Sequence, residues 1–295
     1  MSNEFVGKTA IISGGAGGIG FALAEEFGQL GMKIVIADID QKELAKAEQA
    51  LIDANIQVLA CPLDVTDYQQ WQDIVAAAEE KFGNIHMLVN NAGVGGIPGS
   101  VDKTKVETWQ WVLDVNVMGV VHGTQATAPS MKRHGQGGWI INVASMAGMH
   151  GVPFSGAYAA SKAAVVSMSE SWAVELKKYN IAVSALCPAF VQTRIHESLR
   201  NLQPEYKGVM EQAITLAKSG NNVNKAKALV ESGIPASVLA KRVVESLQSG
   251  QAYIFTHPNF RSSVAYRSSL LDAAFADAEN SPIVSHLKDD EIVML

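Results

Sequence analysis

The chain has 295 residues, of which 48% are hydrophobic and 18% charged, and its formal net charge is −6. An acidic balance without a basic run argues against nucleic acid or an anionic membrane as a partner. The seven histidines are scattered, so no metal site is expected. No basic segment of a signal peptide opens the chain, and Cys61 and Cys187 lie in apolar strand-like runs. We therefore expect a cytoplasmic protein without disulfides.

The first predicted elements are a buried strand over residues 9–13 and an amphipathic helix over residues 21–30, joined by a glycine-rich turn. Glycines 14, 18 and 20 give the pattern G-x-x-x-G-x-G. Such a turn lets the backbone approach a pyrophosphate closely and presents the free N–H groups of a helix N-terminus to an anion. The residues expected to bind a dinucleotide here are Gly14, Gly18, Ile19 and Gly20.

The second strand, residues 33–37, ends at Asp38, eighteen residues after Gly20. A carboxylate at this position can accept both hydroxyls of the adenine ribose and would repel a 2′-phosphate. No arginine or lysine lies in the glycine turn or beside Asp38 in the sequence, so no clamp for a phosphate is expected. The sequence therefore favours NAD over NADP.

A tyrosine and a lysine four residues apart, Tyr158 and Lys162, lie on one face of a predicted helix. The ordinary pKa of a tyrosine is about 10, and a neighbouring ammonium lowers it, which makes the phenol a usable general acid/base. Ser145 ends the apolar run of residues 139–144, at the carboxyl end of a predicted strand. Open α/β sheets bind their ligands at that end.

With these motifs in this order, the chain resembles the short-chain dehydrogenase/reductase family from Lys8 to Thr256. The resemblance implies further roles. Asp64 and Val65 contact adenine, and Asn91, Ala92 and Gly93 lie beside the cofactor. Asn116 holds a proton-relay water, and the segment with Pro188, Val191 and Thr193 holds the nicotinamide carboxamide. The chain departs from the family pattern at Ser13, where threonine is usual, and at Ala189, where glycine is common.

Strand-like and helix-like runs alternate from residue 9 to residue 254, as parallel β-α-β units require. We expect a three-layer doubly wound (Rossmann) parallel sheet with helices on both faces, in a single catalytic domain over residues 1–295. Residues 195–235 are predicted as a substrate-covering helical segment and residues 257–295 as a C-terminal extension. The extension is predicted to contain a helix near residues 260–278 with one apolar face. The extension either packs across a subunit interface or over a neighbouring active site, or is a frayed terminus.

The resemblance implies hydride transfer between NAD(H) and an alcohol or ketone. Tyr158 would act as the acid/base, Lys162 would also bind the nicotinamide ribose, and Ser145 would stabilise charge on the substrate oxygen. The catalytic set is Asn116, Ser145, Tyr158 and Lys162. Substrate-binding residues are expected to be Ser145, Met146, His150, Phe154, Tyr158 and Phe190, which are mostly apolar. They favour a lipophilic or aromatic secondary alcohol or ketone, and the tail resembles that of dehydrogenases acting on benzylic alcohols of lignin-derived aryl ethers.

Two other functions would leave a different pattern in the sequence. A non-catalytic NAD-sensing interaction protein would keep the glycine turn but lose the catalytic set, which is complete here. An enoyl reductase would space its tyrosine and lysine as Y-x6-K, whereas this chain has Y-x3-K. The helix with Tyr158 is rich in small residues, namely Ala157, Ala159, Ala160, Ala163 and Ala164. Related proteins pair this helix with its copy, so a homodimer or homotetramer is expected.

Overall fold

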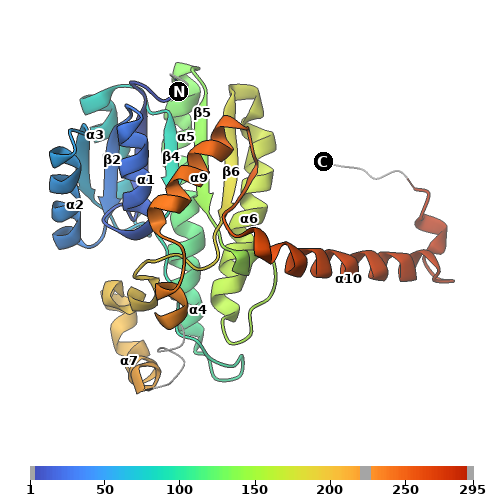
Figure 1. The fold of residues 1–295 in the computed structure, drawn as a ribbon. Helices are drawn as coiled ribbons and strands as arrows, with labels where there is room; N and C mark the ends of the chain where they lie inside the picture. The colour runs from blue at the N-terminus through green and yellow to red at the C-terminus, as the bar shows by residue number, and fades with distance from the viewer. Residues whose placement is uncertain (1–3, 220–226, 291–295) are drawn as a thin grey trace. The chain divides into compact units, whose positions relative to one another are not determined.

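Seven parallel strands form one sheet in the order β3-β2-β1-β4-β5-β6-β7 (Figure 1). The computed structural model describes residues 4–219 and 227–290. The strands are β1 (Thr9–Ser13), β2 (Lys33–Asp38), β3 (Val58–Pro62), β4 (Met87–Asn90), β5 (Gly138–Val143), β6 (Ile181–Cys187) and β7 (Tyr253–Phe255). The strand order reverses between the central strands β1 and β4, so the carboxyl ends of these two strands form a topological switch point. The predicted doubly wound fold is confirmed.

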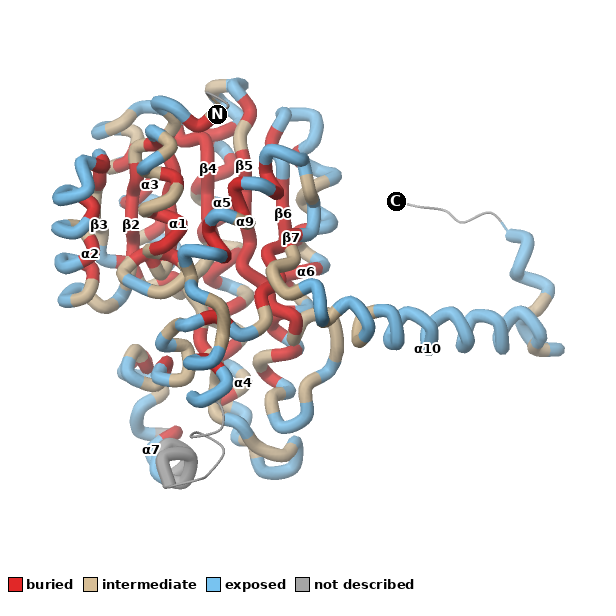
Figure 2. The backbone as a smooth tube through the Cα atoms, viewed as in Figure 1, coloured by how far each residue is buried: buried red, intermediate tan, exposed pale blue. Residues whose placement is uncertain are grey.

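Helices cover both faces of the sheet because successive strand side chains point to opposite sides. Ile12 packs in one apolar core with Leu23, whereas its neighbour Ile11 packs in a second core with Trp71. The central strands β1, β4, β5 and β6 are buried along most of their length (Figure 2), whereas the edge strands β3 and β7 are partly exposed. The helices are α1 (Gly18–Gln29), α2 (Gln41–Asp53), α3 (Tyr68–Phe82), α4 (Val106–Leu113), α5 (Gly119–His134), α6 (Gly156–Leu176), α7 (Pro204–Ser219), α9 (Ala236–Gln248) and α10 (Arg261–Glu279). No helix in the described part of the chain is long and apolar enough to cross a membrane.

The carboxyl ends of β1, β2, β4, β5 and β6 meet at one edge of the sheet, as parallel pairing requires. The segment after β6 continues into a 3-10 helix, η4 (Ile195–Asn201), and then into α7. The expected covering segment, residues 195–235, is helical over most of its described part. Residues 220–226 of that segment lie outside the described residues. Both cysteines are free.

Residue contacts divide the chain into two units, Met1–Thr256 and His257–Leu295. The second unit begins where the sequence places the C-terminal extension. Its helix α10 has no buried residue, and Tyr266 and Phe275 are 66% and 72% exposed. Apolar side chains exposed to this extent on a helix mark a surface that another molecule can cover. Docking of the extension onto a second subunit stays a prediction.

Candidate active site

The turn after β1 is too tightly packed to accept side chains. Gly14 has a φ of +63°, and a Cβ added there would lie 2.9 Å from the Cα of Ala92. A Cβ on Gly20 would lie 2.2 Å from the carbonyl oxygen of Gly14. No side chain caps the first turn of α1, so its N–H groups stay available to an anion. The turn is therefore a cradle that fits the diphosphate of a dinucleotide.

A side-chain network ties this glycine turn to the turn after β4. The Asn91 amide donates to the carbonyl oxygens of Ser13 (2.9 Å) and Gly14 (3.0 Å). In return, the Ser13 hydroxyl accepts hydrogen bonds from the backbone N–H groups of Asn91 (3.1 Å) and Ala92 (3.2 Å). Ser13 thus performs this linking role with its hydroxyl, although the family usually has threonine here.

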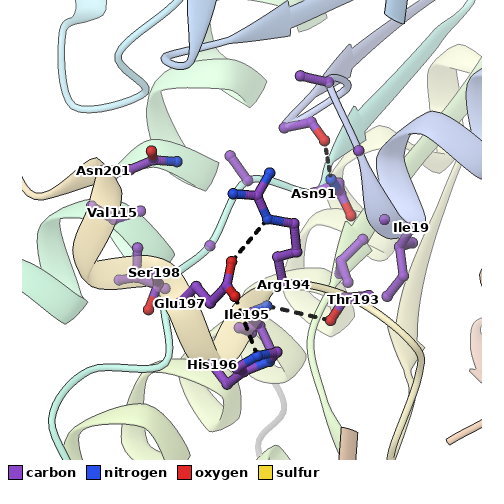
Figure 3. Close-up of a pocket in the computed structure, with 18 of the residues that line it drawn as sticks. Ile19, Asn91, Val115, Thr193, Arg194, Ile195, His196, Glu197, Ser198 and Asn201 are labelled. Atoms are coloured by element: carbon purple, nitrogen blue, oxygen red, sulfur yellow. Dashed lines mark hydrogen bonds and ion pairs between the residues drawn. The ribbon is translucent and has the colours of Figure 1, made fainter. Parts of the chain in front are cut away.

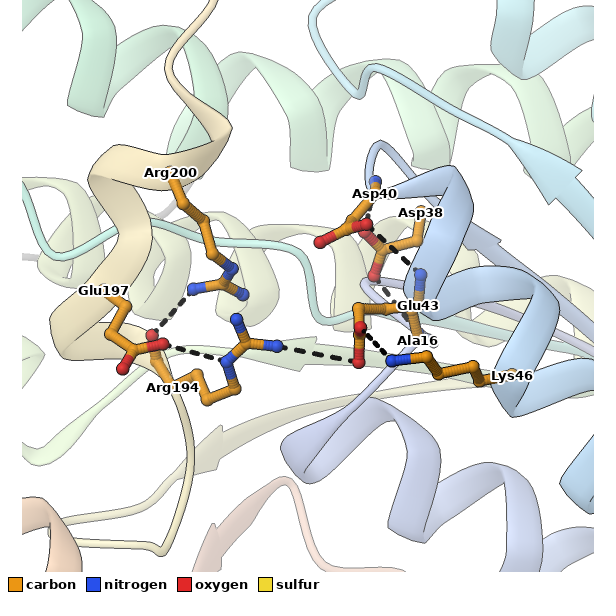
Figure 4. Close-up of polar contacts among 8 residues, drawn as sticks. All are labelled: Ala16, Asp38, Asp40, Glu43, Lys46, Arg194, Glu197 and Arg200. Atoms are coloured by element: carbon orange, nitrogen blue, oxygen red, sulfur yellow. Dashed lines mark hydrogen bonds and ion pairs between the residues drawn. The ribbon is translucent and has the colours of Figure 1, made fainter.

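Asp38, at the end of β2, accepts hydrogen bonds from the backbone N–H groups of Ala16 (3.1 Å) and Asp40 (3.0 Å). Burial raises the pKa of its carboxyl, and these two hydrogen bonds partly oppose the rise. The sequence places no arginine or lysine beside Asp38, but the fold corrects that expectation. Arg194 and Arg200 reach toward this acidic edge from the segment after β6 (Figure 4).

The two arginines belong to residues 193–203, which we name the β6–α7 segment. Arg194 donates from Nε to Glu197 at 2.9 Å, and its Nη1 lies 3.7 Å from Oε2 of Glu43 on α2. Arg200 Nη1 donates to the carbonyl oxygen of Arg194 at 3.0 Å. The segment therefore carries positive charge to the edge of the site that holds Asp38 and Glu43.

Ser145 and Tyr158 meet at the carboxyl end of β5. The Ser145 hydroxyl accepts a hydrogen bond from the N–H of Ala147 (3.1 Å) and lies 3.4 Å from the carbonyl oxygen of Pro188. Burial raises the pKa of Tyr158, and a hydrogen bond with Ser145 opposes the rise. The predicted lowering of this pKa by Lys162 is therefore wrong for this structure, because desolvation of the phenol outweighs the other influences.

Lys162 lies one helical turn beyond Tyr158 and is only 4% exposed. Its Nζ lies 5.8 Å from the centre of the Tyr158 ring and donates to the carbonyl oxygen of Val143 at 2.7 Å. Burial lowers the pKa of Lys162 to about 8. A Cβ on Gly93 would come within 3.4 Å of Nζ, so the absence of a side chain at Gly93 keeps this ammonium accessible.

Asn116 lies in a π-helical turn, η1 (Asp114–Met118), and is fully buried. Its Oδ1 accepts from the N–H of Val94 (2.8 Å), and its Nδ2 donates to the Val94 carbonyl oxygen (3.0 Å) and the Ser161 hydroxyl (3.0 Å). These three bonds join the loop after β4 to the helical turn between Tyr158 and Lys162. Interruptions of this kind in a helix are frequent at functional sites.

A cleft of about 700 Å³ runs along this edge of the sheet (Figure 3). Thr193 covers its glycine turn, since a Cβ on Gly18 would lie 3.1 Å from the Thr193 methyl. The expected cofactor-binding residues that line the cleft are Gly14, Gly18, Ile19, Asp38, Asp64, Val65, Asn91, Ala92, Gly93, Tyr158, Lys162, Pro188, Val191 and Thr193, together with Ser145. Gly20 and Asn116 lie behind this lining.

The expected substrate residues are not gathered in one place. Phe154 lines a second cavity of about 100 Å³, which also touches Tyr158. Met146 is buried and donates its N–H to the carbonyl oxygen of Pro188 at 2.9 Å. His150 and Phe190 line neither cavity as described, and Phe190 is 40% exposed. Among the described residues, no group of His, Cys, Asp or Glu side chains could hold a metal ion.

Known proteins share this architecture. A family model described as short chain dehydrogenase matches residues 8–204. The chain belongs to the short-chain dehydrogenase/reductase family. A CLA biosynthesis dehydrogenase/reductase of Lactiplantibacillus plantarum is 33% identical over 259 residues, which cover 87% of this chain and 90% of the relative. A C alpha-dehydrogenase of Sphingobium sp. (strain NBRC 103272 / SYK-6) is 30% identical over 280 residues, which cover 95% and 90%.

A solved structure agrees over nearly the full length. It is a short-chain dehydrogenase/reductase from Burkholderia phymatum in complex with NAD, with 34% identity, a TM-score of 0.83 and 99% coverage of each chain. The present short-chain dehydrogenase/reductase is accordingly an oxidoreductase with a Rossmann fold. What sequence inspection missed in this member is the contribution of Glu43, Arg194 and Arg200 to the cleft. One signal was present, because Arg194 directly follows Thr193, a residue already expected at the cofactor.

Proposed function

We propose that the protein transfers a hydride between NAD(H) and a lipophilic or aromatic secondary alcohol or ketone, with Tyr158 as the general acid/base. The observation that carries this proposal is one continuous cleft, lined by the glycine turn and Asp38 and also by Ser145, Tyr158 and Lys162. Such a cleft combines a nucleotide cradle with a group that exchanges a proton, as reduction of a carbonyl requires. The NAD complex of the Burkholderia phymatum relative supports the choice of cofactor.

The residues present fit this cofactor. The cradle around Gly14 would hold the diphosphate, and the Asp38 carboxylate would accept the hydroxyls of the adenine ribose. Lys162 would hold the nicotinamide ribose, and Thr193 would contact the carboxamide. When bound, NAD⁺ supplies the carbon that accepts the hydride.

The chain's own residues would handle the proton. In oxidation, Tyr158 takes the proton of the substrate hydroxyl, and in reduction it returns a proton to the carbonyl oxygen. Ser145 donates its hydroxyl hydrogen to the same oxygen and stabilises the negative charge that develops there. The Ala147 N–H holds the Ser145 oxygen in place at 3.1 Å. Asn116 fixes the helical turn that carries Tyr158 and Lys162.

The second cavity supports an apolar substrate. This cavity shares Tyr158 with the cleft. Trp109 and Gly156 also line it and are in close contact, since a Cβ on Gly156 would lie 3.2 Å from the Trp109 ring. Other members of its lining are Ile97, Pro98, Val101 and Phe154. No arginine or lysine lies among the described residues that line it, which disfavours a carboxylate or phosphate on this part of the substrate. The described helices of residues 195–235 are proposed to cover the substrate.

We also propose that the protein is a homodimer or homotetramer built on α6. Ala157 and Ala159 face the core, but Ala160 and Ala163 are exposed on the outer face of this helix. Val174 on the same helix is 78% exposed. Small and apolar residues on an outer helix face allow the close approach of a second copy.

A panel of secondary alcohols tests the proposed function. With NAD⁺ in excess, we expect aryl and long-chain secondary alcohols to give NADH, and hydroxy acids of similar size to give little, because the cavity beside Tyr158 offers no cation. NADH formation is followed by its absorbance, and the reverse reaction is measured with the matching ketones. If no alcohol reacts although NADH binds the protein, the assignment as an alcohol dehydrogenase fails.

Replacing Asp38 with alanine should change the choice of cofactor. The native protein is expected to prefer NAD over NADP in kcat/KM by roughly 100-fold or more, because a 2′-phosphate would face the carboxylate. In Asp38→Ala this preference should fall at least about tenfold, since Arg200 lies close enough to attract the 2′-phosphate. The exposed Asp73→Ala on α3 is the control. A native preference for NADP would show that Asp38 does not face the ribose.

A further inference from the structure

The cleft holds few cations. Among the described residues that line it, the positively charged ones are Lys162, Arg194, Arg200 and Lys227. Lys162 is buried beside Tyr158 and bound to the Val143 carbonyl. Lys227 is paired with Glu231 at 3.7 Å. The glycine turn supplies N–H groups but no charged side chain. The remaining cations of the lining are Arg194 and Arg200 of the β6–α7 segment.

Arg194 is the better placed of the two arginines in that segment. It directly follows Thr193, whose methyl lies 3.1 Å from the position of a Cβ on Gly18, at the start of α1. Its Nη1 lies 3.7 Å from Oε2 of Glu43, in the first turn of α2. The guanidinium thus lies between the N-termini of the two helices that follow β1 and β2. A dinucleotide whose adenine ribose lies at Asp38 must place its diphosphate in this region.

We propose that Arg194 binds the cofactor diphosphate, exchanging its contact with Glu43 for phosphate oxygens, and thereby fastens the β6–α7 segment over the bound cofactor. The inference rests on the proposed use of NAD. The contact that is given up is weak, because the Arg194 and Glu43 side chains are 52% and 31% exposed and their atoms are 3.7 Å apart. Arginine–phosphate hydrogen bonds are shorter, charge-assisted and often bidentate.

The other contacts of the β6–α7 segment do not involve Glu43, so they can remain when Arg194 gives up that carboxylate. Glu197 holds Nε at 2.9 Å and so orients the guanidinium with its outer nitrogens toward the cleft. Ser198 accepts from the Gly95 N–H at 3.1 Å, and Gln203 donates to Asp64 at 3.2 Å. The segment is therefore already attached to the cofactor side of the cleft at two points beyond Arg194.

The test measures ligand binding without substrate. NADH, ADP and adenosine are titrated into the native protein and into Arg194→Gln, with calorimetry as the readout. We expect the Kd of NADH and of ADP to rise roughly 10- to 50-fold in Arg194→Gln, while the Kd of adenosine, which has no phosphate, changes less than about twofold. Arg133→Gln on α5 is the matched control. Arg133 is also an exposed arginine with a carboxylate partner, Glu79, but neither residue lines the cleft.

A second variant separates phosphate binding from a structural role of the ion pair. Glu43→Gln removes the competing carboxylate, so its Kd for NADH should be equal to or lower than the native value. Three results would overturn the inference: unchanged NADH binding in Arg194→Gln, an equal loss for adenosine and ADP, or a loss in Glu43→Gln that matches that of Arg194→Gln. If the native protein bound no NADH at all, the proposed function itself would fail.

Discussion

Tyr158→Phe is expected to lower kcat by roughly 10²- to 10⁴-fold in both directions, because the ring stays while the proton-exchanging hydroxyl is lost. NADH binding and the melting temperature should stay close to native values. Ser145 loses one partner but keeps the Ala147 N–H, so the local structure is held. Steady-state kinetics and NADH titration measure both effects. Tyr179→Phe, at the far end of the α6 region and 37% exposed, is the matched control.

The pH dependence offers a second readout of the same residue. Burial raises the pKa of Tyr158, so the phenol is protonated at neutral pH. Alcohol oxidation needs the deprotonated form and should become faster as the pH rises into the alkaline range, whereas ketone reduction should not. Turnover of Tyr158→Phe within about tenfold of native would contradict the assignment of Tyr158 as the acid/base.

Lys162→Met is expected to abolish most turnover and yet stabilise the protein at neutral pH. The pKa of Lys162 is about 8 in the folded chain and 10.5 as the reference value, so near pH 7 the folded state holds a buried charge. That difference corresponds to roughly 3 kcal/mol of destabilisation. Losing the hydrogen bond from Nζ to Val143 costs about 1 kcal/mol. The free energy of unfolding should therefore rise by about 2 kcal/mol.

The sign of this effect can be checked through its pH dependence. Below about pH 8 the lysine is charged in both states and the penalty is complete. As the pH rises toward about 10, the folded state loses the proton first, so the native protein gains stability relative to Lys162→Met. Urea unfolding near pH 7 and near pH 10 measures the difference, with the exposed Lys177→Met as the control. A stability difference that does not shrink with pH would show that Lys162 carries no such cost.

The sequence predicts those features, such as strands and tight turns, that are determined by residues close together along the chain. Strands buried on both faces appear as continuous apolar runs, and the glycine turn is a local requirement of the backbone between β1 and α1. Consequently the predicted fold is confirmed, and nearly all expected cofactor residues line one cleft. Their binding of NAD stays a prediction. The reversal between β1 and β4 was implied only by the family resemblance.

Features that depend on folding at long range were missed. Arg194 and Arg200 reach the site of Asp38 only because the carboxyl ends of β6 and β2 open toward the same cleft, although the two strands lie near opposite edges of the sheet. The pKa of Tyr158 follows from desolvation, which a spacing of four residues does not reveal. The cavity at Tyr158 likewise depends on the close contact of Trp109 on α4 with Gly156 on α6.

The three bonds of Asn116 also have a consequence for how the chain acquires activity. They join partners 22 and 45 residues apart in sequence, from the loop after β4, the π-helical turn and α6. Such contacts form only once the intervening loops are closed, at a cost in chain entropy. Helix α6 alone, or a partly folded intermediate with native secondary structure, would not hold Tyr158 and Lys162 in position. Catalytic competence therefore depends on tertiary contacts between these three elements, and secondary structure alone does not supply it.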